Sequence, residues 1–206
     1  MAKAKTLLWL ADTGPLNPDW FAAGVDWLND DERLRHGRFV RAERRRQFVA
    51  SRVLLRMALG ELLGVAARKI ALIERPGNAP ALAFPQRPGP WLSISHSGQW
   101  VACAVSLVGA VGLDIERIDP TRDVLAIAEQ VFGSEQAGQL AAMVTGKRVD
   151  EFYRMWCRYE AHIKLGCAGA QDTFYASSGL AMVLSCTQAL DVKPAMIDMA
   201  GLLCAA

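Results

Sequence analysis

A seven-residue stretch with two acidic side chains, Val111–Arg117, constrains this chain more than any other feature of its sequence. Apolar residues alternate along it with glycine, aspartate and glutamate, and a period of two is typical of a β-strand. Asp114 and Glu116 therefore share one face, about 6.5–7 Å apart along the backbone. Two carboxylates at that spacing can close around one divalent cation, and Gly112 leaves room beside them for a ligand. An edge strand with two surface acids is the alternative, and the segment alone favours neither.

The length and composition indicate a folded globular protein. With 206 residues, 52% of them hydrophobic, the chain can bury a core as one domain or two packed lobes. No apolar run approaches the roughly 18 residues of a membrane span, and Thr6–Leu10 is too short for a signal peptide, so it predicts a first strand. The five cysteines include no C-x-x-C pair. This usage is typical of reduced core thiols in a cytoplasmic protein, not of disulfides or a zinc site.

Arginine is concentrated in one segment, although the formal net charge of the chain is only +2. Asn29 or Asp30 can cap a helix, and apolar residues at helical spacing predict two helices or one broken helix over residues 30–63. The basic face of this segment fits a solvated surface, a nucleic-acid patch, or a site for a phosphorylated ligand or acidic protein. A run of charge is usually a solvated surface, but arginine binds phosphate in a bidentate manner, which keeps the other two open. The arginines are Arg33, Arg35, Arg38, Arg41, Arg44, Arg45, Arg46, Arg52 and Arg56.

A second alternating stretch, at residues 91–97, predicts a strand that delivers His96 and Ser97 to a turn. A single histidine is more often structural than functional. This one lies among three hydroxyls, because Ser93 and Ser95 precede it. Hydroxyl and imidazole groups can hydrogen-bond phosphate oxygens, so the stretch is a candidate phosphate-binding segment.

A third feature is a predicted helix at about residues 149–165, on which Trp156, Glu160 and Lys164 are spaced four apart and share one stripe. One interpretation is a surface Glu–Lys pair, worth only about 0.3–0.5 kcal/mol. In the other, Glu160 brings a third carboxylate to the two acids of the first stretch, and Lys164 contacts an anionic ligand nearby.

The three features, in this order, resemble the signature of the 4′-phosphopantetheinyl transferases of the surfactin-synthetase type. That family carries S-x-S-H-S, G-x-D-x-E and W-x-x-K-E-A-x-x-K, and the corresponding segments here are Ser93–Ser97, Gly112–Glu116 and Trp156–Lys164. The arginine-rich segment at residues 45–56 is similar to the family's N-terminal helix. The resemblance spans residues 30 to 170, which is most of the chain.

The resemblance implies an α+β fold of two similar lobes, related by a pseudo-two-fold axis, each a small, mainly antiparallel sheet packed with helices. We expect the first lobe, residues 1–98, to contain the arginine-rich helix and the serine–histidine turn. The second lobe, residues 99–206, would contain the metal-binding acids and the tryptophan–glutamate helix. Coenzyme A would lie in the cleft between them. Two-lobed members of the family can work as monomers, and the sequence does not fix the oligomeric state.

The activity implied is the Mg²⁺-dependent transfer of the 4′-phosphopantetheine arm of coenzyme A to a serine of an acyl or peptidyl carrier protein, with release of adenosine 3′,5′-bisphosphate. Such transfer serves fatty-acid, polyketide or nonribosomal peptide biosynthesis. By motif position, Asp114, Glu116 and Glu160 would hold Mg²⁺, which would neutralise charge on the leaving group. Glu160, or a water on the metal, would take the proton from the carrier serine. The residues implied to bind coenzyme A are Arg33, Arg35, Ser95, His96 and Lys164.

The sequence departs from the family pattern at several positions. Tyr159 stands where the family has a lysine before the third acid, Ala79 where a phosphate-binding lysine is expected, and Gln136 where an acid is frequent. Arg158 and the arginines of the first helix are candidates to compensate for the missing cations. The segment after residue 169 is short and weakly patterned, so we expect abbreviated final strands.

Two other functions stay open at this point. A non-catalytic relative that binds coenzyme A as a partner of a synthase would explain the missing lysines, and it predicts binding without turnover. A nucleic-acid-binding module built on the arginine-rich helix would leave the three acids without a purpose and predicts affinity that falls steeply with salt. Because the three acids count against nucleic acid and no apolar run is long enough to span a membrane, we expect neither nucleic acid nor a membrane as a partner.

Overall fold

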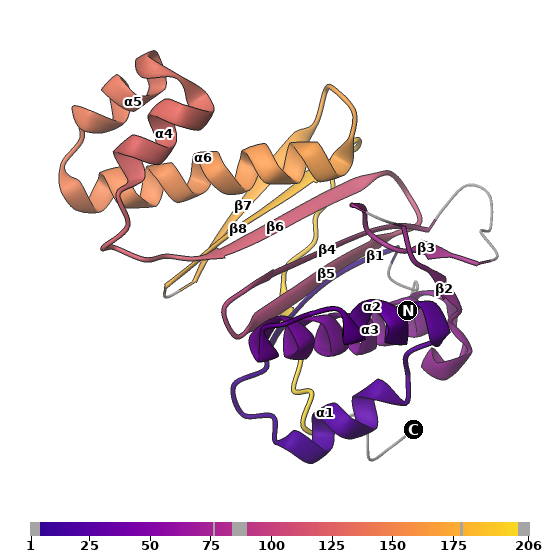
Figure 1. Cartoon of the computed structure of the whole chain (residues 1–206). Helices are drawn as coiled ribbons and strands as arrows, with labels where there is room; N and C mark the ends of the chain where they lie inside the picture. The colour runs from indigo at the N-terminus through magenta and orange to yellow at the C-terminus, as the bar shows by residue number, and fades with distance from the viewer. Residues whose placement is uncertain (1–4, 76, 84–89, 178, 202–206) are drawn as a thin grey trace.

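The structure, a computed structural model, describes residues 5–75, 77–83, 90–177 and 179–201. Its helices and strands are arranged in two lobes (Figure 1). In chain order the elements are β1 (Thr6–Asp12), α1 (Pro18–Val25), α2 (Asp30–Gly37), α3 (Ala42–Leu63), the 3-10 helix η1 (Ala67–Lys69), β2 (Leu72–Ile73), β3 (Ala81–Leu82), β4 (Trp91–Ser97), β5 (Trp100–Ser106), β6 (Val111–Arg117), α4 (Val124–Phe132), α5 (Ser134–Ala141), α6 (Thr145–Leu165), β7 (Gln171–Ser177), β8 (Leu180–Cys186) and β9 (Ala195–Met196).

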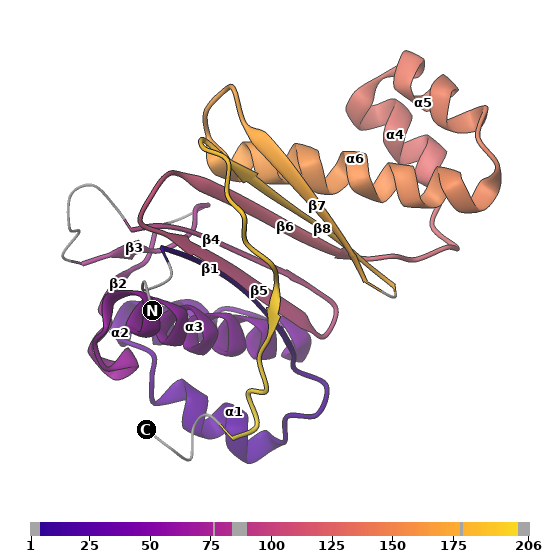
Figure 2. The ribbon, with the colours of Figure 1, turned by 180° about the vertical axis from the view of Figure 1, so that it is seen from behind.

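Each lobe combines one sheet with one long helix. The first sheet has the order β4-β5-β1-β9 and packs against α3, and the second has the order β6-β8-β7 and packs against α6. All pairings in these sheets are antiparallel except that of β9 with β1. The two long helices lie on the outer sides and the sheets between them (Figures 1 and 2). The predicted α+β fold of two similar lobes is confirmed.

The buried apolar side chains form three layers: one between α3 and the first sheet, one between the two sheets, and one between the second sheet and the helices α4–α6. On β1, Trp9 belongs to the core between the first sheet and α3, whereas Leu8 and Leu10 belong to the core between the two sheets. On β6, Leu113 and Ile115 join that same central core. Successive side chains of a strand point to opposite faces, so β1 and β6 are each covered on both sides. The acidic face of β6 therefore lies under α6 and not in open solvent.

The connections between the lobes are more extensive than the sequence suggested. β5 pairs with both β1 and β4, so the first sheet includes residues beyond 98. The division at residues 98 and 99 stays a prediction, and the topology favours a division between β5 and β6. The final strands of the second lobe are not abbreviated, since β7 and β8 pair over seven residues each. The chain then returns to the first lobe, where the indole of Trp20 donates to the carbonyl of Met199 at 2.7 Å.

The arginine-rich segment forms two helices, α2 and α3, and not one broken helix. Asn29 caps α2, and Glu32 completes a capping box with it. Only part of the expected basic face is exposed, because residues 41–46 lie at the surface whereas α3 is buried from residue 47 to residue 56. Arg52 and Arg56 lie inside this buried part and pair with the fully buried carboxylate of Glu32. Buried arginines need such partners, and these two are unavailable to a polyanion at the surface.

Gly112 was expected to leave room for a ligand, and the structure corrects this. A Cβ atom at residue 112 would lie 2.0 Å from the carbonyl oxygen of Ala161 and 2.8 Å from the amide nitrogen of Leu165. The missing side chain therefore lets the backbone of α6 approach β6. This close contact is what covers the acidic face of the strand.

Other sequence expectations concern single residues and short segments. Among the described cysteines, Cys103, Cys157 and Cys186 are buried free thiols and Cys167 is exposed. The fifth cysteine and most of the predicted turn at 85–90 lie outside the described residues. In the part of the chain that the structure describes, no helix combines the length and apolar character that a membrane crossing requires.

Candidate functional site

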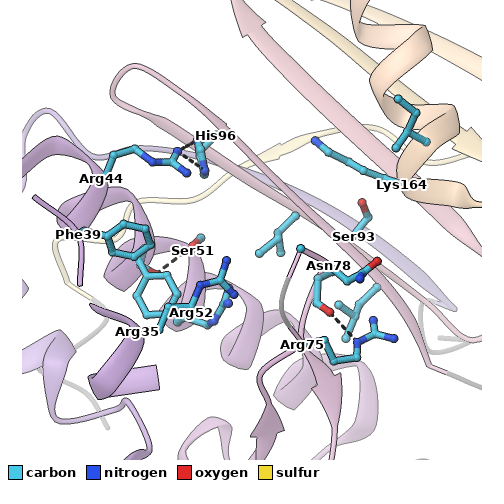
Figure 3. Close-up of a pocket in the computed structure, with 16 residues that line it drawn as sticks. Arg35, Phe39, Arg44, Ser51, Arg52, Arg75, Asn78, Ser93, His96 and Lys164 are labelled. Carbon is cyan, nitrogen blue, oxygen red and sulfur yellow. Dashed lines mark hydrogen bonds between the residues drawn. The ribbon is translucent and has the colours of Figure 1, made fainter. Parts of the chain in front are cut away.

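A cavity of about 340 Å³ lies between the lobes and is lined by α2, α3, the loop at residues 75–79, β4 and the end of α6 (Figure 3). Its lining is rich in basic side chains, and each of these five segments contributes at least one. A concave site with convergent positive charge suits a ligand that carries several negative charges. The basic side chains that line it are Arg35, Arg44, Arg52, Arg75, His96 and Lys164.

Beside the cavity, serine hydroxyls join the edges of the two sheets. The hydroxyls of Ser93, Ser95 and Ser97 on β4 accept hydrogen bonds at 2.9, 3.3 and 3.0 Å from the backbone amides of residues 113, 115 and 117 on β6. We call this set of three hydrogen bonds the serine ladder. Both strands have a period of two, so every second serine meets every second amide. The serines thus satisfy the edge of β6, which has a backbone partner, β8, on its other side only.

The serine ladder also holds the two acids of β6. Ser95 donates to Asp114 Oδ1 at 2.8 Å, and Ser97 donates to Glu116 Oε2 at 2.7 Å. The ammonium of Lys164 donates to the same Asp114 oxygen at 2.6 Å and to the hydroxyl of Ser95 and the carbonyl of Leu113, both at 3.1 Å. Lys164 therefore pairs with Asp114 and not with Glu160, so the simple surface Glu–Lys pair is wrong.

The acid pair fits a divalent cation. Asp114 is 5% exposed, and its second oxygen, Oδ2, is buried without a hydrogen-bond partner among the described residues. Burial raises the pKa of the neighbouring Glu116, and the charge of Asp114 raises it further, against hydrogen bonds from Ser97 and Trp156. A buried carboxylate oxygen with no partner is costly. A hard cation such as Mg²⁺, which prefers oxygen ligands, would satisfy it.

The third predicted ligand, Glu160, lies half-buried on α6 between Trp156 and Lys164, which both contact the acids of β6. The stripe of α6 that carries Trp156, Glu160 and Lys164 therefore faces the acid pair. Within the described ranges, no set of three or more histidine, cysteine, aspartate or glutamate side chains is arranged so that it could hold a metal ion. The role of Glu160 as the third ligand stays a prediction.

Of the residues predicted to bind coenzyme A, the structure brings three to the cavity: Arg35, His96 and Lys164. Ser95 is not among the lining residues, because it is buried in the serine ladder. Arg33 is not among them either, since its Nε donates to the carbonyl of Leu28. The roles of all five toward coenzyme A stay predictions.

The cavity includes side chains that the sequence named only as members of the arginine-rich segment, or did not name at all. Arg44, Phe48 and Arg52 are spaced four residues apart on α3, and all three line the cavity. This spacing could have shown from the sequence that they share one face of the helix. Arg75 has no such pattern, because only the course of the loop brings it there. Arg158, considered as a compensating cation, pairs with Asp172 at 2.9 Å and does not line the cavity.

The side chains of Arg44 and His96, which both line the cavity, contact each other (Figure 3). An Nη1 atom of Arg44 lies 2.6 Å from Nε2 and 3.0 Å from Nδ1 of the imidazole. Burial lowers the pKa of His96 to about 4, and the charges of Arg44 and Lys164 contribute to this. The imidazole is therefore neutral at pH 7 and adds hydrogen-bonding capacity but no charge to the site.

Two family models match most of the chain. The model described as "4'-phosphopantetheinyl transferase, N-terminal" matches residues 14–108, and the model described as "4'-phosphopantetheinyl transferase superfamily" matches residues 110–189. The two matches meet between β5 and β6, at the same point where the sheet topology favours a division of the lobes.

Three curated proteins illustrate the similarity. The chain is 32% identical to the 4′-phosphopantetheinyl transferase HetI of Nostoc over 139 residues, which is 66% of this chain and 58% of HetI. It is 31% identical to AcpT of Salmonella typhi over 145 residues, 70% of this chain and 71% of AcpT. It is 27% identical to Sfp of Bacillus subtilis over 150 residues, 73% of this chain and 65% of Sfp. The matches thus span less than two thirds of HetI and of Sfp.

Proposed function

Because the chain belongs to the 4′-phosphopantetheinyl transferase superfamily, we propose that it transfers the 4′-phosphopantetheine arm of coenzyme A to a serine hydroxyl of an acyl or peptidyl carrier protein. The serine oxygen forms a bond to the phosphorus that bears pantetheine, and the bond from that phosphorus to the nucleotide breaks. Adenosine 3′,5′-bisphosphate leaves, and the serine proton passes to a base, for which Glu160 is the candidate. The observation that carries this proposal is the cation-lined cavity directly beside the buried acid pair.

The residues of the chain divide into two groups in this proposal. The cavity holds the phosphates of coenzyme A through arginine side chains and orients the diphosphate toward the acid pair. Asp114 and Glu116 would hold Mg²⁺ together with Glu160, and the bound cation would neutralise charge on the leaving group. Ser95 and Lys164 fix the orientation of Asp114, because both donate hydrogen bonds to its Oδ1 atom. This leaves the buried Oδ2 atom as the free ligand.

We also propose that the enzyme is of the surfactin-synthetase-activating type, which rests on the three motifs and the two-lobed fold. A non-catalytic relative that binds coenzyme A is the second candidate. It is favoured by Tyr159 and Ala79, which stand where the family carries lysines, and by Lys164, whose three hydrogen bonds go to groups of the protein itself.

A mass assay separates these candidates. The chain is incubated with coenzyme A, Mg²⁺ and a set of unmodified carrier proteins of fatty-acid, polyketide and peptide synthases. We expect at least one carrier to gain the mass of one phosphopantetheine group. Binding of coenzyme A without transfer to any carrier would favour the non-catalytic relative and contradict catalysis.

Substitution of Asp114 tests the acid site. We expect Asp114→Ala to lower Mg²⁺-dependent transfer by about 100-fold or more, because the proposed Mg²⁺ site loses a ligand and the leaving group loses electrostatic stabilisation. Asp114→Asn keeps the volume and a hydrogen-bond acceptor for Lys164, so it tests the charge if the alanine variant fails to fold. Asp191→Ala, at an exposed aspartate, is the control. An unchanged transfer rate in the folded Asp114→Asn protein would show that the site is assigned wrongly.

A further inference from the structure

The five permanently charged side chains of the cavity differ in whether they already form an ion pair with a carboxylate of the protein. Arg35 and Arg52 both bind the carboxylate of Glu74, with 2.6 Å between Arg52 Nη2 and Glu74 Oε1. Lys164 binds Asp114. These three cations are held by partners that are at least 90% buried, since the side chains of Glu74 and Asp114 are 10% and 7% exposed. Turning one of them toward a ligand would leave a buried acid without its cation, which is costly.

Arg44 and Arg75 are different. Neither has an acidic side chain within the 4.0 Å ion-pair distance among the described residues. Arg44 donates to the neutral amide oxygen of Gln47 at 3.0 Å and contacts the imidazole of His96. Arg75 donates through Nε to the carbonyl oxygen of Ala79 at 2.8 Å. Both guanidinium groups therefore keep their full positive charge beside the cavity.

The loop that carries Arg75 also fixes its guanidinium. The amide of Asn78 donates to the carbonyl of Arg75 at 3.1 Å, while Arg75 Nε donates to the carbonyl of Ala79, so the two bonds close a short ring. Gly77 has φ +73°, a left-handed conformation that glycine adopts without strain. This ring places a guanidinium directly at residue 79, and the two terminal nitrogens of Arg75 remain for a ligand.

The two arginines come from different walls of the cavity. Arg44 lies near the start of α3 beside His96, and Arg75 lies on the loop next to Asn78 (Figure 3). A ligand that reaches both must carry negative charge at two separated points. Coenzyme A does so, with a diphosphate and a separate 3′-phosphate.

We propose that Arg44 and Arg75 are the two cations of this chain that bind the phosphate groups of coenzyme A, one at each end of the cavity. Arg35, Arg52 and Lys164 act as a positioning framework whose side chains are already held in ion pairs with Glu32, Glu74 and Asp114. The proposal rests on the proposed function, since it takes coenzyme A as the ligand. Arginine suits the role because its planar guanidinium forms two parallel hydrogen bonds to phosphate.

Titration calorimetry with coenzyme A and with dephospho-coenzyme A, which lacks the 3′-phosphate, tests the proposal. We expect Arg44→Ala and Arg75→Ala each to raise the Kd for coenzyme A by about 10- to 150-fold, the range for loss of a hydrogen bond to a charged group. A substitution that has no effect with dephospho-coenzyme A assigns its arginine to the 3′-phosphate. One that weakens both ligands assigns it to the diphosphate.

Arg45→Ala is the matched control, because it also removes one positive charge and one guanidinium bond to a carbonyl, that of Phe39 at 2.7 Å, from a side chain that does not line the cavity. Its Kd should stay within about twofold of the wild type. Arg75→Lys keeps the charge but loses the bond to Ala79, so we expect an intermediate Kd. Thermal melts establish that each variant is folded.

The possible failures are distinguishable. If the wild type binds coenzyme A and transfers its arm, but folded Arg44→Ala and Arg75→Ala bind as tightly as Arg45→Ala, the assignment of these two arginines is wrong and the proposed function stands. If the wild type binds no coenzyme A, both proposals fail together.

Discussion

At the scale of single residues, burial and neighbouring charges decide which groups of the site are ionised. Glu116 lies on the half-buried end of β6, where burial raises its pKa. His96 lies between Arg44 and Lys164, and both cations disfavour a further positive charge. The site thus combines permanent cations with a neutral imidazole, and its charge at neutral pH comes from arginine, lysine and the acids alone.

We expect the imidazole of His96 to titrate at a pKa of about 4, because of its burial and its cationic neighbours. In Arg44→Ala this pKa should rise part of the way toward 6.5, because one cation is removed while the burial and Lys164 remain. Side-chain NMR of the histidines measures both values, with His96→Gln to assign the signal. Because the pKa of the folded state lies below that of the unfolded state, the unfolded chain takes up this proton first, so His96 destabilises the fold as the pH falls from about 6.5 to about 4. Titration near 6.5 in the wild type would contradict the buried environment of the ring.

At the scale of elements, the contact of β6 with α6 assembles the acid site. Lys164 at the end of the helix reaches Asp114, and Trp156 two turns earlier reaches Glu116. Both contacts require the backbones to approach closely, which the lack of a side chain at Gly112 permits. The helix is placed by packing on the strand, and its polar contacts then follow from its helical repeat.

Gly112→Ala should therefore separate the two elements. The new Cβ atom meets the backbone of α6, which cannot rotate away as a side chain would, so we expect a loss of about 1–3 kcal/mol in the free energy of unfolding, or more. Urea unfolding measures it. Gly138→Ala is the control, because residue 138 lies in α5 with open space around its Cβ position. There the same substitution should stabilise by about 0.4–1 kcal/mol. Equal effects at the two positions would exclude a special contact at Gly112.

At the scale of the whole molecule, the two lobes are joined in three ways. The sheets share a central apolar core, the serine ladder connects their edges, and the C-terminal part of the chain adds β9 to the first sheet. The cavity lies where these lobes meet, with lining residues from β4 of the first lobe and α6 of the second. Its shape therefore depends on the serine ladder, which sets the distance between β4 and β6.

Ser93→Ala tests whether the serine ladder joins the two lobes. The amide of Leu113 is buried and would lose its hydrogen-bond partner, so we expect a loss of about 1–3 kcal/mol in the free energy of unfolding. Amide hydrogen exchange should be faster at Leu113 than in the wild type. Thr6→Ala is the control, since the hydroxyl of Thr6 bonds Ser106 within the first sheet and should leave exchange at Leu113 unchanged. Unaltered exchange at Leu113 in Ser93→Ala would show that the serine ladder does not hold the lobes together.

Local patterns in the sequence predict most of the elements and the order of the motifs. The alternation at residues 111–117 predicted β6 with its bounds. The capping residue and apolar spacing predicted two helices or one broken helix over residues 30–63, where the structure has two. It also placed Asp114 and Glu116 on one face and Trp156 and Lys164 on one stripe. These features depend on local periodicity, which any stretch of 7 to 20 residues carries in itself.

The residues that contact each face of a helix or strand could be learned only from the three-dimensional structure. The sequence does not show that Gly112 makes room for a helix, that Arg52 forms an ion pair with Glu74, or that the loop brings Arg75 to residue 79 and the cavity. Periodicity tells which side chains share a face, but the partner of that face comes from a distant part of the chain. Since a charge in a protein is used or neutralised by its neighbours in space, the division between framework cations and ligand-binding cations is set by the fold.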